Sequence, residues 1–288
     1  MRYRFMKDNR SYFPVRKMAY VLDVSTSGYY RWCKQRPSPR ARENSRLDQE
    51  IRSIYQVNKG RYGSPKITDE LRTVRCWRVG HNRVARRMRA MGLRSIVRRK
   101  YRVTTNSKHS FPVAENLLNR QFKAEHPNQT WVGDITYIQA GERWLYFAVF
   151  IDLFSRTVVG WALSESLEHS FVLHALERAI MRRRPSQGLM IHSDRGIQYC
   201  CDDFRKAIRQ GGFVQSMCRK GDCWDNAVAE SFFHLFKTEL IYPEKLKTKE
   251  EIEKAVFEYI EVYFNRQRRH SSIDYRTPEE FERVAMVA

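Results

Sequence analysis

The sequence has few cysteines, and none of them is spaced like a metal-binding or redox motif. Six cysteines occur among 288 residues. They form no CxxC pair, and no pair of histidines at ligand spacing accompanies them. We therefore do not expect a structural zinc site, and reduced thiols in a cytosolic protein are the simpler interpretation.

The chain also lacks a long apolar segment. Its longest apolar run, Trp144–Ile151, is far shorter than the roughly 20 residues that a membrane-spanning helix needs. The first residues, MRYRFMKDNR, do not have the apolar stretch of a secretory signal. Hydrophobic residues nevertheless make up 42% of the chain and aromatic residues 13%. We expect a globular protein with two or more domains.

Acidic residues are scarce in the first 110 positions. This part carries 29 Lys and Arg against 7 Asp and Glu, and the remainder carries 24 against 25. The net charge of +21 therefore comes almost wholly from the first 110 residues. A run of charge is often only a solvated surface. An excess this large and this localised instead predicts a polyanionic partner, of which nucleic acid is the commonest.

Two short helical units are predicted within this basic region. Residues 1–45 contain a helix near Met18–Leu22, Ser and Thr residues suited to an N-cap, and the segment GYYRWCKQR, which together outline a candidate helix-turn-helix. Residues 46–105 contain a second, basic helix-turn-helix whose last helix should begin at Asn82 as N-cap and end at Gly92. That helix is either a solvated basic surface or, as we favour, a DNA contact. The residues expected to touch DNA are Arg83, Arg86 and Arg87.

A polar linker is predicted over residues 106–127, with a short helical piece at Ala114–Phe122. Just before it, a cluster of cations could follow a phosphate backbone as the chain crosses between domains. These cations are Arg98, Arg99 and Lys100.

Residues 128–240 alternate between strand and helix patterns. The runs WVGDITYI, RWLYFAVFI and TVVGWAL follow one another with short turns, which predicts an antiparallel meander. A helix, the strand LMIHS, a helix, the strand FVQSM and a helix from about Asn226 to Leu240 complete the order βββαβαβα. This order predicts an α/β fold with a mixed five-stranded sheet and helices on both faces. Residues 241–288 should form a helical extension.

Three carboxylates lie on separate elements of this predicted core. Asp134 lies mid-strand, Asp194 ends another strand, and Glu230 lies in the last helix with 35 residues between it and Asp194. Taken singly, Asp194 could be a helix N-cap and Glu230 a surface residue. Together they could converge on two divalent cations that activate a water or a 3′-hydroxyl and stabilise the leaving oxygen. Oxygen ligands favour Mg²⁺, with Mn²⁺ as a substitute.

Several neighbouring residues have open interpretations. Asn226 and Lys237 fall on the Glu230 face of the last helix, and Asn226 is a candidate DNA contact. His192 could approach a scissile phosphate, although packing within its strand is the simpler account. Asp152 and Asp225 are assigned to turn or capping positions. Cys223 and Trp224 are assigned to packing.

Five segments carry a resemblance to a known family: HPNQTWVGDITYI, FIDLFSRTVVGWAL, IHSDRGIQY, GDCWDNAVAESFFHLFKTEL and NRQRRHSSIDYRTPEEF. The chain resembles the OrfB transposases of bacterial insertion sequences with two overlapping reading frames, relatives of retroviral integrases. The resemblance covers about residues 45–285, and it implies an RNase H-like core in which Asp134, Asp194 and Glu230 are the catalytic and metal-binding residues. It also implies that Lys237 contacts DNA near the cleaved end. GRYGSPKI and the following basic helix match the DNA-binding segment of the family, which adds Arg61 and Lys66 to the expected contacts.

The resemblance further implies partners and a location. Double-stranded DNA is expected at both the terminal repeats and the target. An OrfA protein is expected as a partner or as a frameshifted fusion, and a homodimer or larger assembly is expected at synapsis. The expected place is the bacterial cytoplasm, at the nucleoid. Because the chain begins at its own Met1, we expect part of the terminal-repeat recognition to lie outside it.

The resulting hypothesis is a DNA transposase that cleaves element ends and transfers strands. Two alternatives remain open at this point. One is a catalytically idle DNA-binding regulator, and the other is an RNase H-like nuclease or resolvase that cuts without joining.

Overall fold

The computed structural model describes residues 1–34, 38–96, 112–219, 223–246 and 248–287, so Arg98, Arg99 and Lys100 lie outside the described residues. In these ranges no helix is both long and apolar enough to cross a membrane.

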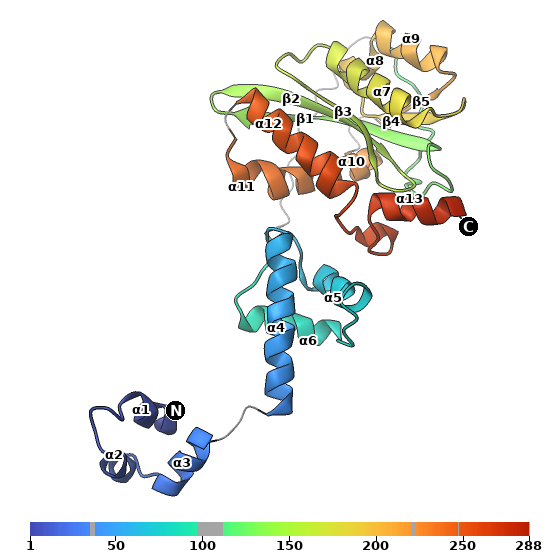
Figure 1. Cartoon of the computed structure of the whole chain (residues 1–288). Helices are drawn as coiled ribbons and strands as arrows, with labels where there is room; N and C mark the ends of the chain where they lie inside the picture. The colour runs from blue at the N-terminus through green and yellow to red at the C-terminus, as the bar shows by residue number, and fades with distance from the viewer. Residues whose placement is uncertain (35–37, 97–111, 220–222, 247, 288) are drawn as a thin grey trace.

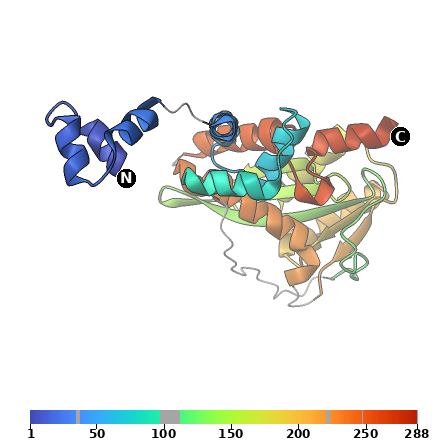
Figure 2. The ribbon, with the colours of Figure 1, turned by 90° about the horizontal axis from the view of Figure 1, so that it is seen from below.

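The first three helices form a unit with its own small core (Figures 1 and 2). They are α1 (Arg2–Asp8), α2 (Val15–Val21) and α3 (Thr26–Lys34). The predicted cap residue is confirmed, because the Ser25 hydroxyl accepts a hydrogen bond from the Gly28 N–H at 2.8 Å, before α3 turns fully helical. Buried Met6, Met18 and Tyr29 hold the three helices together.

A second helical unit consists of α4 (Pro39–Val57), α5 (Ser64–Thr73) and α6 (His81–Ala90). Pro39 occupies the first turn of α4, and the Ser38 hydroxyl accepts the Ala41 N–H at 3.1 Å, so α4 has both start signals that favour a helix. Gly92, with φ of +71°, follows α6 as predicted. The predicted cap at Asn82 is wrong, because α6 already begins at His81 with Gly80 as its N-cap.

The remaining chain builds one mixed sheet of five strands (Figure 1). The strands are β1 (Thr130–Ala140), β2 (Arg143–Asp152), β3 (Val158–Ser164), β4 (Met190–Ser193) and β5 (Val214–Met217). Their spatial order is β3-β2-β1-β4-β5, with β1 antiparallel to β2 and parallel to β4. The predicted meander and mixed α/β sheet are confirmed. Asp152 ends β2 and accepts the N–H groups of Asn128 and Phe154, which is the turn role predicted for it.

Helices cover both faces of the sheet. On one face lie α7 (Ser170–Arg183), α8 (Ile197–Cys200) and α9 (Asp202–Gln210), which share a core with Trp131, Phe150 and Ile191. On the other lie α10 (Ala227–Phe236) and α12 (Lys249–Phe257), which share a core with Val132 and Ile138. Since successive strand residues point to opposite faces, this second face is also the one that Asp134 shares.

The last helix of the predicted core is not a uniform α-helix. A 3₁₀ turn at Cys223–Asn226 precedes α10, and a π-helical segment, Lys237–Ile241, follows it and leads into α11 (Tyr242–Glu244). We call Lys237–Ile241 the π-turn. A capping box of Thr248 and Glu251 then starts α12, a second π-helical segment covers Glu258–Phe264, a 3₁₀ turn covers Ser271–Ile273, and α13 spans Pro278–Val287.

Two sequence predictions differ from the structure, one for residues 114–122 and one for Trp224. Residues 114–122 are not helical, because this stretch runs beside β5 and its backbone bonds there. The N–H groups of Leu117 and Leu118 donate to the Ser216 hydroxyl, and the Glu115 carbonyl accepts from Met217. Trp224 is 63% exposed rather than buried.

Candidate active site

Asp134 lies in the middle of the sheet, on the face that α10 covers. Its side chain is partly buried, and its Oδ1 accepts the N–H of Ile135 at 2.8 Å. Burial, then the neighbouring Asp194 and Glu230, raise the pKa of Asp134 well above its usual value, although the Ile135 N–H and Lys237 oppose them. The shift shows that three carboxylates and one lysine lie within electrostatic reach of one another.

Asp194 reaches this cluster because β4 lies next to β1. The two strands run parallel with Gly133 opposite Ser193. Asp134 and Asp194 directly follow this pair, so they lie side by side. Asp194 follows the last residue of β4, where its Oδ1 accepts the N–H of Gly196 at 2.9 Å. A Cβ at Gly196 would lie 3.0 Å from that oxygen, so a glycine there leaves the carboxylate room.

Glu230 joins them from the first turn of α10. Asn226, just before this helix, donates its side-chain N–H to the Gly133 carbonyl at 3.2 Å and thereby fixes the start of α10 against β1. Glu230 lies four residues further, hence on the same helix face. Lys237 follows in the π-turn, where burial lowers its pKa and Asp134 opposes that effect.

The donor set suits a hard divalent cation. The three acidic side chains offer oxygens alone, which Mg²⁺ prefers. In the ranges that the structure describes, no three Asp, Glu, His or Cys side chains already stand at metal-ligand spacing. Three carboxylates repel one another, and a divalent cation would reverse that repulsion and draw them together.

A buried network supports the site from β4 and β5. His192 is fully buried, and its Nε2 donates to the Asp225 carbonyl at 3.0 Å. The Ser216 hydroxyl accepts two backbone N–H groups and therefore directs its own proton to Nδ1 of His192, 2.8 Å away. Burial lowers the pKa of His192 to about 4, although Asp225 opposes this shift. His192 is thus a neutral packed histidine, as the simpler interpretation had it.

Asp225 is a structural residue that the sequence assigned only to a loop or cap. Its side chain is completely buried, and it pairs with Arg120 at 3.0 Å and Arg219 at 3.2 Å. Burial raises the pKa of Asp225, but the Arg219 N–H and the two arginines outweigh burial, so its pKa lies below the usual value. Arg120 lies 105 positions away from Asp225 in the sequence, so no local pattern could have revealed this ion pair.

The expected DNA contacts of α6 fall into two classes. Arg83 pairs with Glu43 and Asn44, and Arg87 forms a two-bonded ion pair with Asp48, so both connect α6 to α4. Arg86 is exposed to solvent and therefore accessible to DNA.

The other expected contacts within the described chain are less accessible. Arg61 is only 7% exposed and Asn226 only 4%. Lys66 is partly buried, and burial, with Arg268 nearby, lowers its pKa to about 7, against the attraction of Glu239. The structure thus gives Arg61, Lys66 and Asn226 intramolecular surroundings, and their contact with DNA stays a prediction.

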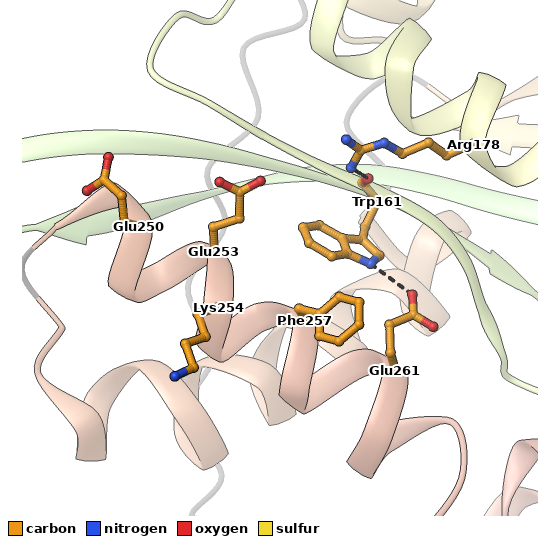
Figure 3. A pocket seen from close by; sticks show the side chains of 7 residues that line it. All are labelled: Trp161, Arg178, Glu250, Glu253, Lys254, Phe257 and Glu261. Carbon is orange, nitrogen blue, oxygen red and sulfur yellow. Dashed lines mark hydrogen bonds between the residues drawn. The ribbon is translucent and has the colours of Figure 1, made fainter.

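A groove of about 630 Å³ lies elsewhere, between β3, α7 and α12 (Figure 3). Trp161 lies in its wall, where its indole N–H donates to Glu261 at 3.1 Å and the Arg178 guanidinium is 5.8 Å from its ring centroid. Glu250 and Glu253 also face it. Three carboxylates disfavour a phosphate backbone, and β3 is separated from β1 by β2, so this groove is not the site of the acidic triad.

Comparisons with known proteins identify domain models that match parts of the chain and solved structures that resemble it. An HTH-like domain matches residues 42–101, and integrase core domains match residues 124–223 and 230–286. Among solved structures, the chain is similar to a simian T-cell lymphotropic virus intasome in complex with the PP2A regulatory subunit B56 gamma (16% identity, TM-score 0.45, covering 81% of this chain and 74% of that one). It is also similar to the HTLV-2 integrase catalytic core domain in complex with magnesium (17% identity, TM-score 0.42, covering 55% and 99%).

Relatives in sequence are much closer. Transposase InsF for insertion sequence IS3A of Escherichia coli (strain K12) is 40% identical over 284 residues, which is 98% of both chains. The insertion element IS600 uncharacterized 31 kDa protein of Shigella sonnei is 40% identical over 264 residues, covering 92% of this chain and 97% of that protein. With this identity over nearly the whole length, an HTH-like domain and an integrase core, the chain belongs to the OrfB-type transposases of the IS3 family.

Proposed function

We propose that this protein cleaves the ends of an insertion sequence and joins them to target DNA, using Asp134, Asp194 and Glu230 as its catalytic carboxylates. The observation that carries the proposal is the convergence of these three side chains from a strand, a strand end and a helix. A charge buried in a sheet is costly unless something pairs with it. Asp134 is such a charge, and Asp194 and Glu230 beside it raise the cost further, so a cation site explains the cluster better than the stability of the fold does.

The reaction consists of two in-line displacements at phosphorus. In the first, water attacks the phosphodiester at the element end, and the bond to the leaving 3′-oxygen breaks to give a free 3′-hydroxyl. In the second, that hydroxyl attacks a target phosphodiester, so one P–O bond forms and another breaks without a covalent enzyme intermediate. Two bound Mg²⁺ ions, or Mn²⁺ in their place, would supply activation of the attacking oxygen and neutralisation of the leaving one.

Each residue of the chain has a separate part in this scheme. Asp134, on β1, and Asp194, directly after the neighbouring β4, would hold the ions together with Glu230 of α10. Lys237 lies near Asp134 and would contact a phosphate close to the cleaved end. Asn226 fixes α10 against β1 through the Gly133 carbonyl and so holds Glu230 in place.

The basic helical units would bind the duplex DNA. The 1–45 and 46–105 regions, followed by the linker 106–127, carry the cations, while residues 128–240 form the catalytic core and 241–288 its helical extension. An OrfA protein, a homodimer or larger synaptic complex, and a place at the bacterial nucleoid complete the proposal. The assignments of Lys66, Arg86, Arg98, Arg99 and Lys100 to DNA belong to it as well, whereas Arg83 and Arg87 pair with α4 and Arg61 with the core.

A strand-transfer assay tests the proposal. Wild-type protein, Mg²⁺, OrfA and labelled ends of the insertion sequence that encodes this chain should give joined products. Asp194→Asn should lower the rate by about a thousandfold, equivalent to about 4 kcal/mol of transition-state stabilisation, while DNA binding persists.

The two alternatives give different products. A nuclease or resolvase would cut the ends and join nothing. A DNA-binding regulator would bind DNA and give neither product, in the wild type and in Asp194→Asn alike. Either result would refute the transposase proposal.

A further inference from the structure

The α4–α6 unit is attached to the core through residues that the sequence assigned to DNA. In both views it lies against the side of the core built by the C-terminal helices (Figures 1 and 2). Arg61, in the turn between α4 and α5, donates from Nη2 to the Glu239 carbonyl at 3.1 Å. Its guanidinium lies 4.3 Å from the ring centroid of Tyr263 and 5.4 Å from that of Tyr259. Contacts of this kind, away from solvent, contribute more than exposed ones.

The next residue of the turn makes the same connection by hydrogen bonds. The Tyr62 hydroxyl donates to the Gln267 carbonyl at 3.2 Å and accepts the Arg269 N–H at 2.9 Å. Arg269 also pairs with Asp69 of α5 at 2.6 Å. Tyr62 is 1% exposed and belongs to the core of its own unit, so these hydrogen bonds connect that core directly to the C-terminal segment.

Glu239 lies at the centre of this interface. It is 2% exposed, and its carboxylate accepts hydrogen bonds from Arg268 at 2.7 Å and from the Tyr259 hydroxyl at 2.9 Å. Burial raises the pKa of Glu239, but Arg268, Lys66 and Tyr259 outweigh burial, so its pKa lies below the usual value. The carboxylate is therefore charged, and it is surrounded by cations from both bodies.

The same short segment also carries the lysine of the active site. Glu239 and Lys237 are two residues apart in the π-turn, where Lys237 interacts with Asp134 and Glu239 faces the α4–α6 unit. Segments of π-helix inside α-helices occur frequently at functional sites. A shift of the Glu239 backbone would move Lys237 with it.

We propose that Arg61 and Glu239 are positioning residues, which hold the π-turn so that docking of the DNA-binding unit keeps Lys237 in place beside the catalytic carboxylates. The inference rests on the proposed function. It makes the interface a coupling element: the DNA-binding unit both holds the duplex and sets the geometry of the active site. It also predicts that Arg61 acts without touching DNA.

The test uses full-length Arg61→Met, which keeps a long side chain in the turn but removes the guanidinium. Lys59→Met is the matched control, because Lys59 pairs with Glu244 at the rim of the same interface and both side chains are exposed. Each variant is measured for affinity to duplex element ends over a range of salt, for single-turnover strand transfer at saturating DNA, and for amide exchange in Lys237–Ile241.

Arg61→Met should bind DNA with wild-type affinity and salt dependence, yet transfer strands about tenfold to a hundredfold more slowly, as misplacement of a reacting group does. The same substitution in a Lys237→Met background should cause no further loss, because both changes remove one function. Amide exchange in the π-turn should become faster in Arg61→Met and stay unchanged in Lys59→Met. If Arg61→Met does not fold, Tyr62→Phe removes only a hydroxyl and should show the same pattern more weakly.

Three results would overturn the inference if the wild type joins DNA. Strand transfer by Arg61→Met at the wild-type rate would show that the interface is not coupled to the active site. A loss in Arg61→Met that multiplies with the loss in Lys237→Met would show that the two residues act independently. Weaker DNA binding with a salt slope lower by about one would place Arg61 on a phosphate. If the wild type joins no DNA, the proposed function fails, and π-turn exchange then decides the coupling alone: equal exchange in Arg61→Met and wild type refutes it.

Discussion

The buried histidine behind the active site should make the stability of this protein depend on pH. His192 is fully buried between Ser216 and the Asp225 carbonyl. Its Nδ1 already accepts the Ser216 proton, so a second proton on the ring would have no acceptor. Burial lowers its pKa in the folded state to about 4, from 6.5 in the unfolded chain. Acid therefore favours the unfolded chain, which takes up the proton first.

The magnitude follows from the two pKa values. As the pH falls through 6.5, the unfolded chain binds a proton that the folded chain refuses, so stability decreases until about pH 4, where the folded state also protonates. Over the whole window the loss amounts to about 3 kcal/mol, and between pH 7 and pH 5 to about 2 kcal/mol. His270 is also buried with a lowered pKa, because of burial and nearby Arg268, and it acts in the same direction.

A variant isolates the contribution of His192 from that of His270. His192→Gln keeps a side chain that can donate to the Asp225 carbonyl but cannot titrate. Denaturant unfolding followed by circular dichroism at pH 7 and pH 5 should show a wild-type loss that exceeds that of the variant by about 2 kcal/mol. An equal loss in both proteins, or a His192 proton resonance that titrates near pH 6.5, would refute the assignment.

Two further substitutions test the fold and the DNA-binding unit. Gly160→Ala should destabilise the core by about 1–3 kcal/mol, because the new Cβ would lie 2.3 Å from the Ala175 carbonyl oxygen. Gly80→Ala is the control, because a Cβ there meets nothing within 4 Å and should be tolerated. Equal melting temperatures for the two variants would contradict the close packing of β3 on α7. Arg86→Ala should weaken duplex binding and lower the salt slope by about one without loss of stability. Arg87→Ala should instead lower the stability of the packing between α4 and α6, because it removes the ion pair with Asp48. The reverse pattern in binding and unfolding assays would contradict the placement of these two arginines.

The sequence could predict that Asp134, Asp194 and Glu230 lie near one another, because each of them follows a local rule. Alternation put Asp134 on the right face of its strand, the end of an apolar run marked Asp194, and helical spacing related Glu230 to Lys237. The short connections between the first three strands predicted the antiparallel meander. All of these patterns extend over a few residues, which is the range that a sequence displays directly.

The predictions that failed or stayed open depend on distant partners. Arg61 looks like any cation in a basic segment, and its neighbour Glu239 lies 178 positions away. Residues 114–122 have a helical composition, but Ser216 and Met217 provide the partners that their backbone uses. The π-turn has no sequence signature of its own, and its contact with the α4–α6 unit, through the Glu239 carbonyl, comes from a distant part of the chain.

The central claim is that the carboxylates of Asp134, Asp194 and Glu230 carry out strand transfer. The most direct measurement is the single-turnover rate of joining in preassembled protein–DNA complexes with Mg²⁺, comparing Glu230→Gln with Glu253→Gln, an exposed glutamate of α12. Glu230→Gln should lose about a thousandfold in rate at unchanged DNA binding, and Glu253→Gln should join DNA like the wild type. Joining by Glu230→Gln at the wild-type rate would contradict the claim.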